Sequence, residues 1–310
     1  MEYTHKPVLL NEFLENVPKK VGPAQSKVEG VFVDGTLGGG SHTKALLLQL
    51  KVKSKKLKVV GIDRDLEAIF AAKKNLLDFE KQITFIHDNY TAMPIILKNL
   101  KIKKVDLIFL DLGVSSYQFD NPERGFSFQN NAPLDMRMDQ SQKITAGEIV
   151  NYYKENELSG IFFKFGEERF SRQIARKIVE KRKEKPIKTT KELVEIIKSA
   201  TPPKNRFSQK IHFATRVFQA LRIEVNDELK NLEGFIPKAI EFLNPGGRLI
   251  IISFHSLEDR IVKHTFRKLA EDYPENYKVL TKKPIIACAE EVRENPRSRS
   301  AKMRVLEKIE

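Results

Sequence analysis

The sequence contains a single cysteine and no long hydrophobic run. Because Cys288 stands alone among 310 residues, the chain forms no internal disulfide and no zinc site built from cysteines. No apolar run approaches the roughly 18 residues that a membrane-spanning helix needs. The first ten residues lack the basic region and apolar stretch of a secretion signal, and the six histidines show no metal-ligand spacing. We therefore expect a protein of the reducing cytoplasm and assign it no metal.

Acidic residues are in the minority, and the imbalance is local. The chain has 55 Lys and Arg against 41 Asp and Glu, a formal net charge of +14. Between Ser171 and Ala220 there are 14 basic and 4 acidic residues, so most of the surplus lies in this stretch. A solvated helical face is the plain alternative. A concentration of this size favours a surface that binds a polyanion, with nucleic acid ahead of an anionic membrane.

Short apolar runs without strict alternation predict strands that are buried on both faces of a sheet. Segments of helical length separate them, which predicts a doubly wound α/β fold. We expect Ser256 and Asp259 to cap the helix after the fifth strand, and Glu290–Ala301 to be a polar, mobile loop. The expected strands are Gly30–Asp34, Leu57–Asp63, Ile83–His87, Val105–Asp111 and Arg248–Phe254, with closing strands at Tyr277–Pro284 and Lys302–Ile309.

The alternation of strands and helices breaks in the middle of the chain. From Pro122 to Lys210 the sequence has amphipathic stretches punctuated by prolines and no clear strand. We interpret this region as a helical insert. The predicted organisation is a first part of the sheet domain at 1–121, the insert at 122–210 and a second part of the sheet domain at 211–310.

A glycine-rich turn, Asp34–His42, follows the first expected strand. Glycines there let the backbone turn tightly and approach a ligand, although a plain tight turn is the alternative. Asp63, at the end of the next strand, would accept hydrogen bonds from ribose hydroxyls in a site for NAD or for S-adenosylmethionine (SAM). Asp34 precedes the glycines, where a carboxylate suits the cationic amino-acid end of SAM and repels a pyrophosphate. We therefore predict SAM as the cofactor.

Two further strand ends lie at the same expected edge of the sheet. Tyr90 follows the third strand, where an aromatic ring would hold an adenine, unless it is an ordinary surface residue. Asp111 ends the fourth strand, beside the expected position of the sulfonium methyl group. Because its upstream neighbours are all but one apolar, we interpret this carboxylate as functional.

Many motifs resemble, in the same order and over nearly the full chain, those of the bacterial 16S ribosomal RNA cytosine-N4 methyltransferases. A chance match to so many long motifs is very improbable. The motifs are His5–Leu10, Asp34–His42, Gly61–Asp65, Leu110–Ser116, Glu123–Phe128, Pro133–Asp139, Gly166–Phe170, Ala214–Arg222, Ile252–Arg260 and Asn295–Ser300.

The resemblance implies a class I, Rossmann-like SAM-dependent methyltransferase sheet with an inserted helical substrate domain. It implies a cytosine in the decoding region of 16S rRNA as the target, presented within the small ribosomal subunit. The oligomeric state stays open, with a homodimer as one option. Ser41 stands where the family usually has Gly or Ala, and Tyr90 where Phe is common. The resemblance and the glycine turn together give the expected cofactor contacts, which are Asp34, Gly38, Gly40, Ser41, His42, Asp63, Tyr90, Asp111 and Gln118.

The amine of cytosine is a weak nucleophile because its lone pair is delocalised into the ring. We expect Asp111, or a backbone carbonyl in Leu112–Ser115, to accept a hydrogen bond from this amine and so turn the lone pair toward the methyl group. The Asp/Asn-Pro-Pro-aromatic motif of many amino-methyltransferases is absent. Methylation of carbon 5 would need a cysteine near the fourth strand, and Cys288, which we expect to be a small buried residue, lies far from it in sequence. Transfer to oxygen stays open.

Aromatic and polar side chains outside the sheet are candidates for contacts with the substrate. Phe126 and Phe128 would stack on an extruded base, with core packing as the alternative. Arg216 and Arg222 lie on the polar flank of an expected helix, where they would meet phosphates or form salt bridges between domains. His255, after the fifth strand, would approach the substrate or make a structural hydrogen bond.

Three other functions compete with this prediction. A nucleotide-dependent oxidoreductase would carry a Gly-x-Gly-x-x-Gly turn, which is absent here. A non-catalytic RNA-binding protein would keep the basic insert but would not need Asp34, Asp63 and Asp111 at one sheet edge. A methyltransferase acting on another RNA or DNA base is the third.

Overall fold

The chain divides into two compact units, each with its own core. The first comprises Met1–Gly113 and Leu229–Glu310, and the second comprises Val114–Glu228. The second unit extends beyond the predicted insert of 122–210 at both ends, because Phe119 and the helix after residue 214 contribute to its core. Lys210, the predicted end of the insert, lies outside the described residues. The computed structural model describes residues 7–18, 30–49, 57–207 and 212–310.

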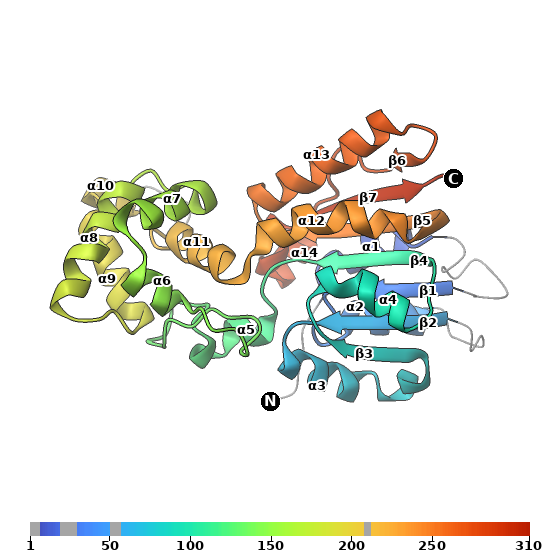
Figure 1. Ribbon diagram of the computed structural model, residues 1–310, viewed down its shortest axis with the longest axis horizontal. Coiled ribbons are helices and arrows are strands. Elements are labelled where there is room, and N and C mark those ends of the chain that lie inside the picture. The colour runs from blue at the N-terminus through green and yellow to red at the C-terminus, as the bar shows by residue number, and fades with distance from the viewer. Residues whose placement is uncertain (1–6, 19–29, 50–56, 208–211) are drawn as a thin grey trace. The chain divides into compact units, whose positions relative to one another are not determined.

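The first unit is built on a seven-stranded sheet with the order β3-β2-β1-β4-β5-β7-β6 (Figure 1). Its first five strands are parallel, and β7 pairs antiparallel with β5 and β6. This topology is that of a class I methyltransferase sheet, so the predicted fold class is confirmed. The strands are β1 (Gly30–Asp34), β2 (Leu57–Asp63), β3 (Ile83–His87), β4 (Val105–Asp111), β5 (Leu243–Ser253), β6 (Tyr277–Val279) and β7 (Lys302–Lys308).

Successive residues of the central strands point to opposite faces of the sheet, and helices cover each face. Phe32 and Phe109 belong to the core on one face, whereas Val33 and Ile108 belong to the core on the other. Apolar runs without alternation therefore mark strands that are buried twice. The first face packs against α1 (Leu10–Asn16), α2 (Ser41–Gln49) and α3 (Leu66–Asn75), followed by η1 (Leu77–Gln82); the second packs against η2 (Tyr90–Ala92), α4 (Met93–Asn99), α12 (Glu228–Glu241) and α13 (Ser256–Asp272).

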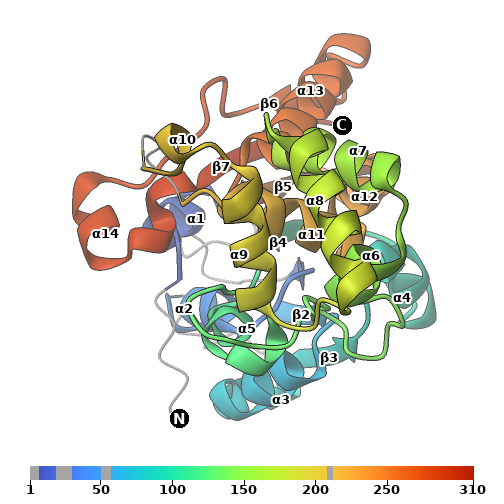
Figure 2. The ribbon, with the colours of Figure 1, turned by 90° about the vertical axis from the view of Figure 1, so that its left-hand side faces the viewer.

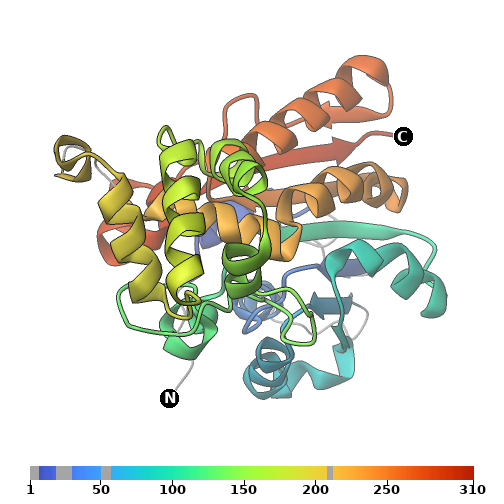
Figure 3. The same cartoon turned by 60° about the vertical axis from the view of Figure 1, so that its left-hand side comes forward.

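The C-terminal region differs from its prediction. Strand β6 ends at Val279 rather than at Pro284, and β5 begins five residues before the predicted Arg248. The segment expected to be a mobile loop instead holds α14 (Ala289–Glu294) and the 3-10 helix η4 (Pro296–Ser300). Cys288 is exposed, not buried, and caps α14 by accepting the Glu291 N–H at 3.5 Å. Figure 3 shows β7 running beside α13 at this end of the sheet.

The second unit is helical (Figure 2). Helix α7 packs against α8 and α11, and α8 packs against α9. A Cβ on Gly166 would lie 2.5 Å from the carbonyl oxygen of Arg216, so glycine permits the close approach of α7 and α11. Its helices are α5 (Ser116–Asp120), η3 (Pro122–Arg124), α6 (Ala146–Tyr152), α7 (Glu155–Gly166), α8 (Ser171–Glu184), α9 (Thr190–Ala200), α10 (Pro203–Phe207) and α11 (Thr215–Asn226).

In the second unit, buried hydrogen bonds join the motif Glu123–Phe128 to the motif Pro133–Asp139. Arg124 is 1% exposed and donates from Nη2 to the carbonyl oxygens of Arg137 and Met138, at 3.1 and 2.9 Å. Asn226 donates to the Met136 carbonyl and accepts the Met138 N–H. These buried hydrogen bonds give a structural reason for the residues at these positions.

No helix in the described ranges combines the length and apolar character needed to cross a membrane.

Candidate active site

Three carboxylates end neighbouring strands at the carboxyl edge of the sheet. Asp63 ends β2, Asp34 ends β1 and Asp111 ends β4, and these strands are adjacent in the sheet. The chain order reverses between β1 and β4, because β2 and β3 extend the sheet on one side of this pair and β5 on the other. Such a switch point is where open α/β sheets bind ligands. The predicted convergence of the three carboxylates is therefore present within the first unit.

The glycine turn is tied to the neighbouring strand through Asp63. One oxygen of its carboxylate accepts the Gly38 N–H at 2.7 Å, and the other accepts the Asp65 N–H at 2.8 Å. Gly38 has a φ of +53°, which a side chain would strain. Burial raises the pKa of Asp63 to about 6 despite these hydrogen bonds. Each oxygen keeps a further lone pair for a ligand hydroxyl.

Gly40 closes the turn and leads into α2. Its N–H donates to the Leu37 carbonyl at 2.7 Å, and its φ is +78°. A Cβ at this position would lie 2.5 Å from Cδ1 of Leu76, so there is neither the conformation nor the space for a side chain. Ser41 is the first residue of α2 and is half-buried.

His42 lies between the first helix and the end of β4. Its Nε2 is 2.9 Å from the Val8 carbonyl oxygen, which can only accept, so Nε2 carries a proton. Its Nδ1 faces the Asp111 carboxylate at 3.7 Å. The rings of Phe13 and Phe109 pack on the imidazole, with centroids at 5.3 and 4.8 Å. His42 is therefore held rigidly with one nitrogen toward Asp111.

Asp111 keeps one oxygen without a partner. Its backbone N–H donates to Oγ1 of Thr36 at 2.6 Å, but its Oδ1 is buried and accepts no hydrogen bond from a described residue. Burial raises the pKa of Asp111 well above 3.8, and the nearby charges of Asp34 and Glu258 raise it further. A buried acceptor in this state would be stabilised by a donor or a cation from a ligand.

Asp34 is engaged by its own turn. It is 1% exposed, and its Oδ2 accepts a hydrogen bond from Oγ1 of Thr43 at 2.7 Å, while Oδ1 accepts the Thr36 N–H at 3.3 Å. Burial raises its pKa to about 7, and the charge of Asp63 adds to that rise. The geometry thus connects β1, the glycine turn and α2 through one carboxylate.

Tyr90 is a core residue at the start of η2, which follows β3. It is 8% exposed, and its ring packs edge-on against Phe235 of α12 at a centroid distance of 4.9 Å. It is therefore not the surface aromatic that was one alternative for this position. Its role toward an adenine stays a prediction.

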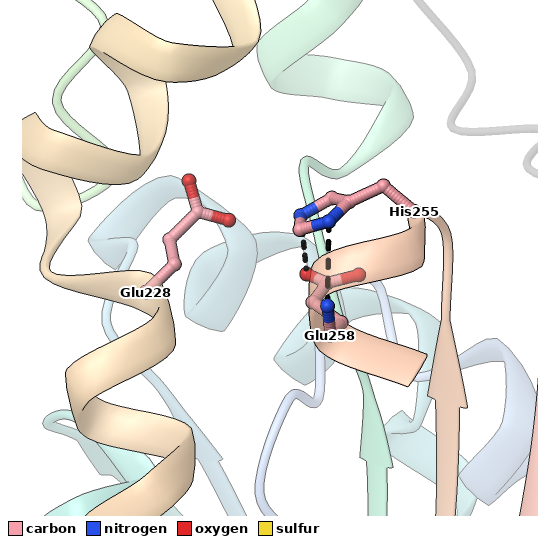
Figure 4. Close-up of side chains that lie close together, drawn as sticks. All are labelled: Glu228, His255 and Glu258. Carbon is pink, nitrogen blue, oxygen red and sulfur yellow. Dashed lines mark hydrogen bonds and ion pairs between the residues drawn. The ribbon is translucent and has the colours of Figure 1, made fainter. Parts of the chain in front are cut away.

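The turn after β5 places His255 and Glu258 together (Figure 4). His255, rather than the predicted Ser256, caps α13: its Nδ1 accepts the Glu258 N–H at 3.4 Å. Its Nε2 lies 3.3 Å from Oε1 of Glu258, and Oε2 of Glu258 accepts the Phe254 N–H at 2.9 Å. Figure 4 also draws Glu228, whose carboxylate binds Arg222 within the second unit at 2.8 Å.

The remaining residues that we predicted to contact the cofactor or the base lie in the second unit. Most of them pack against or hydrogen-bond to other protein groups. Gln118 is buried and forms a capping box with Ser115 at the start of α5. Phe126 is 7% exposed and belongs to the helical core. Phe128 is half-buried, with its ring stacked on His212 at a centroid distance of 4.7 Å.

The polar flank of α11 is bound to protein groups. Arg222 makes two hydrogen bonds to Glu228, at 2.8 and 3.0 Å, and Arg216 donates to the Glu167 carbonyl at 3.1 Å. The ion pair between Arg222 and Glu228 lies within the second unit, so it is not a salt bridge between domains. Contacts of these arginines with phosphates stay a prediction.

Sequence reasoning missed three residues that shape the site. Thr36 and Thr43 hold Asp111 and Asp34, and Glu258 lies close enough to raise the pKa of Asp111. Thr36 lies inside the glycine turn, which is the one signal that pointed to it. The contact of Thr43 depends on how α2 packs, and no local pattern announces it.

A class I sheet whose glycine turn and strand-terminal carboxylates share one edge defines a methyltransferase-like domain. The model of the MraW methylase family matches residues 2–309. The chain belongs to this family, which confirms the resemblance seen in the motifs.

Curated relatives match over nearly all of their length. A protein of Kosmotoga olearia is 48% identical over 99% of this chain and 98% of its own. A protein of Nostoc sp. is 50% identical over 99% and 93%, and one of Clostridium botulinum 49% identical over 100% of each chain. All three are named ribosomal RNA small subunit methyltransferase H.

Proposed function

We propose that this protein transfers a methyl group from SAM to the exocyclic N4 amine of a cytosine in 16S rRNA of the small ribosomal subunit. Membership of the MraW methylase family over residues 2–309 is the observation that carries the proposal. Relatives that match over 93% or more of their own length and are named small subunit rRNA methyltransferases support the RNA substrate. That substrate would place the enzyme in the cytoplasm, where ribosomes are assembled.

The sheet edge of the first unit fits SAM by the chemistry of its groups. Asp111 offers a buried oxygen that has no hydrogen-bond partner among the described residues, and Asp63 keeps lone pairs for ribose hydroxyls. Gly38 and Gly40 have no side chains, so a ligand can approach the backbone of the turn. The acidic edge suits a ligand with an ammonium and a sulfonium group, whereas a pyrophosphate would be repelled.

We assign two different roles to the residues of this edge. Asp34 accepts hydrogen bonds from Thr36 and Thr43, so it holds the turn in place. The proposed direct contacts with the cofactor are Gly38, Gly40, Ser41, His42, Asp63, Tyr90, Asp111 and Gln118.

When bound, SAM supplies an electrophilic methyl group on a positively charged sulfur. Asp111 accepts a hydrogen bond from the cytosine amine, which orients the nitrogen lone pair toward that methyl group. The nitrogen–carbon bond would form as the sulfur–methyl bond of SAM breaks, which leaves S-adenosylhomocysteine. The nitrogen would lose a proton, and Asp111 would take it as general base. Burial and the charges of Asp34 and Glu258 raise the pKa of Asp111, which strengthens it as a base.

Mass spectrometry of 16S rRNA tests the proposed reaction. RNA from a strain that lacks the gene should be missing one N4-methylcytidine, and a plasmid copy of the wild-type gene should restore it. A copy carrying Asp111→Asn, expressed to the same level, should restore little of it. A missing methyl group on another base, or no difference between the strains, would exclude the proposed substrate.

A further inference from the structure

A pocket opens in the first unit beside the carboxyl end of β5. Its volume is about 260 Å³, and it is lined by Phe254 and Ser256 from the β5–α13 turn, Ile286 before α14, and Arg299 and Lys302 around the start of β7. Small-molecule sites usually measure roughly 300–1,000 Å³. The pocket therefore suits a single nucleotide unit better than an extended ligand.

Two cations give the pocket its charge. Arg299 is exposed and makes no ion pair or hydrogen bond with a described residue. Lys302 lies 3.2 Å from Asp259, but the other oxygen of that carboxylate already accepts from Arg304 at 2.7 Å. Two cations thus share one carboxylate, and Arg299 adds an uncompensated charge. An arginine in this state pairs readily with a phosphate.

The turn that carries Arg299 is built to hold it outward. Ser298 is fully buried and donates from Oγ to the Asn295 carbonyl at 2.8 Å. Glu291 of the preceding helix accepts the Leu9 N–H at 2.8 Å, which fastens α14 to the N-terminal segment. The motif Asn295–Ser300 thus forms a turn that is anchored by Ser298 and that presents Arg299 at the surface.

The pocket also has an apolar side, and it lies at the same sheet edge as the candidate active site. Ile286 is 63% exposed beside it. Asp111 and Ile252 are paired in the β4–β5 register, and Cδ2 of Phe254 lies 3.6 Å from the position that a Cβ on Gly113 would take. An RNA strand that presents a base to Asp111 would therefore place one of its neighbouring nucleotides near this pocket.

We propose that this pocket binds a ribosomal RNA nucleotide that flanks the target cytosine, with Arg299 pairing to its phosphate and Ile286 and Phe254 contacting its sugar or base. The proposal rests on the proposed function, since it takes the same RNA as its ligand. It assigns to the Asn295–Ser300 turn a role in positioning the substrate.

Replacement of one arginine tests the pocket. Arg299→Gln is compared with Arg293→Gln, which changes an exposed arginine of α14 that does not line the pocket. Small ribosomal subunits from a strain lacking the gene serve as the RNA probe. Arg299→Gln should weaken subunit binding about tenfold, which corresponds to one charge-assisted pair. Its salt slope should fall by about 0.7, while Arg293→Gln stays near wild type and SAM affinity is unchanged in both.

The outcomes separate the pocket from the reaction. Equal subunit binding by the two variants would overturn the pocket proposal while the reaction stands. A loss of SAM affinity in Arg299→Gln, with subunit binding intact, would overturn it by giving the pocket to the cofactor. A wild-type protein that neither binds nor methylates the subunits would refute the proposed function itself, and the pocket with it.

The single cysteine gives a second measurement without any substitution. Cys288 is exposed and follows Ile286 by two residues. Bound subunits should slow its alkylation by N-ethylmaleimide severalfold, and SAM alone should not. An alkylation rate that the subunits leave unchanged would contradict RNA at this pocket.

Discussion

Asp111 and His42 form the most constrained pair of the site. The Val8 carbonyl fixes the proton of His42 on Nε2, which leaves Nδ1 facing the Asp111 carboxylate at 3.7 Å. Burial raises the pKa of Asp111 well above 3.8, and the charges of Asp34 and Glu258 add to that rise. Asp111 is thus prepared to hold a proton, as a general base must at the end of the transfer.

The variant Asp111→Asn tests this role. The amide keeps the size of the side chain but cannot take the proton. We expect kcat to fall on the order of 10²- to 10⁴-fold, together with a weaker SAM affinity, because Asp111 is also a proposed cofactor contact. The measurement is methyl incorporation into subunits under saturating SAM. Full turnover by this variant would remove Asp111 from the reaction and favour a backbone carbonyl in Leu112–Ser115.

The pH profile of the reaction tests the electrostatics around Asp111. Activity should rise with pH through the raised pKa of Asp111, because the ionised form is the base. The groups in the first unit that face this carboxylate are His42 from α2, Asp34 from β1 and Glu258 from α13. Glu258→Gln removes a negative neighbour, so it should lower that pKa and move the profile to lower pH. A profile that stays in place would contradict the assignment.

Asp34 makes the stability of the fold depend on pH. Its pKa is about 7 in the folded chain, against an ordinary value of 3.8, so protonation favours folding. The associated stability is fully present below about pH 4 and is lost as pH rises through about 7, by roughly 4 kcal/mol. In denaturant unfolding, the free energy of unfolding of Asp34→Asn should therefore fall less between pH 5 and pH 8 than that of the wild type. If the unfolding free energies of the two proteins changed equally with pH, the burial of Asp34 would not contribute to the pH dependence of stability.

At the scale of elements, the glycine turn depends on a backbone that only glycine adopts. Gly40→Ala places a Cβ at a φ of +78° and 2.5 Å from Leu76. We expect a loss of at least about 1–2 kcal/mol of unfolding free energy, together with weaker SAM binding.

Gly160→Ala is the matched control for that substitution. It lies inside α7, where a Cβ would meet nothing within 4 Å. We expect it to raise the unfolding free energy by roughly 0.5–1 kcal/mol and to leave SAM affinity unchanged. Equal effects of the two substitutions would contradict the account of the turn.

The sheet could be predicted from sequence because its strands are buried on two faces, which leaves plain apolar runs such as Val105–Asp111. The segment 289–300 could not, because its helices are short and polar and are fixed by Cys288, Ser298 and a distant bond to Leu9. The positions of Asp63 and Asp111 followed from strand ends. The engagement of Asp34 by Thr43 did not, because it depends on tertiary packing.

At the scale of the whole molecule, the basic stretch is only partly free to bind RNA. Lys177, Lys181 and Lys198 pair with glutamates three residues away on α8 and α9. Arg176 and Lys185 pair with Glu155 and Glu192. The exposed Arg172, Lys183, Lys188 and Lys191 make no ion pair with a described residue. Charges of that kind contribute most to binding a polyanion, since they displace no internal partner.

Neutralising four of these cations tests the surface. The variant changes Arg172, Lys183, Lys188 and Lys191 to glutamine. Each phosphate that these side chains no longer neutralise should reduce the salt slope of subunit binding by about 0.7, so the slope should fall by up to about 3. The control neutralises four exposed lysines of the first unit, Lys74, Lys81, Lys98 and Lys103. Equal reductions in both variants would mean that net charge, not this surface, attracts the RNA.

Calorimetric titration with SAM tests the central claim most directly, with NAD titrated in parallel. The account predicts saturable binding of SAM near one molecule per chain, weakened by Asp63→Ala, and no heat from NAD. Absence of SAM binding, or binding of NAD instead, would contradict the assignment of the sheet edge to a sulfonium methyl donor.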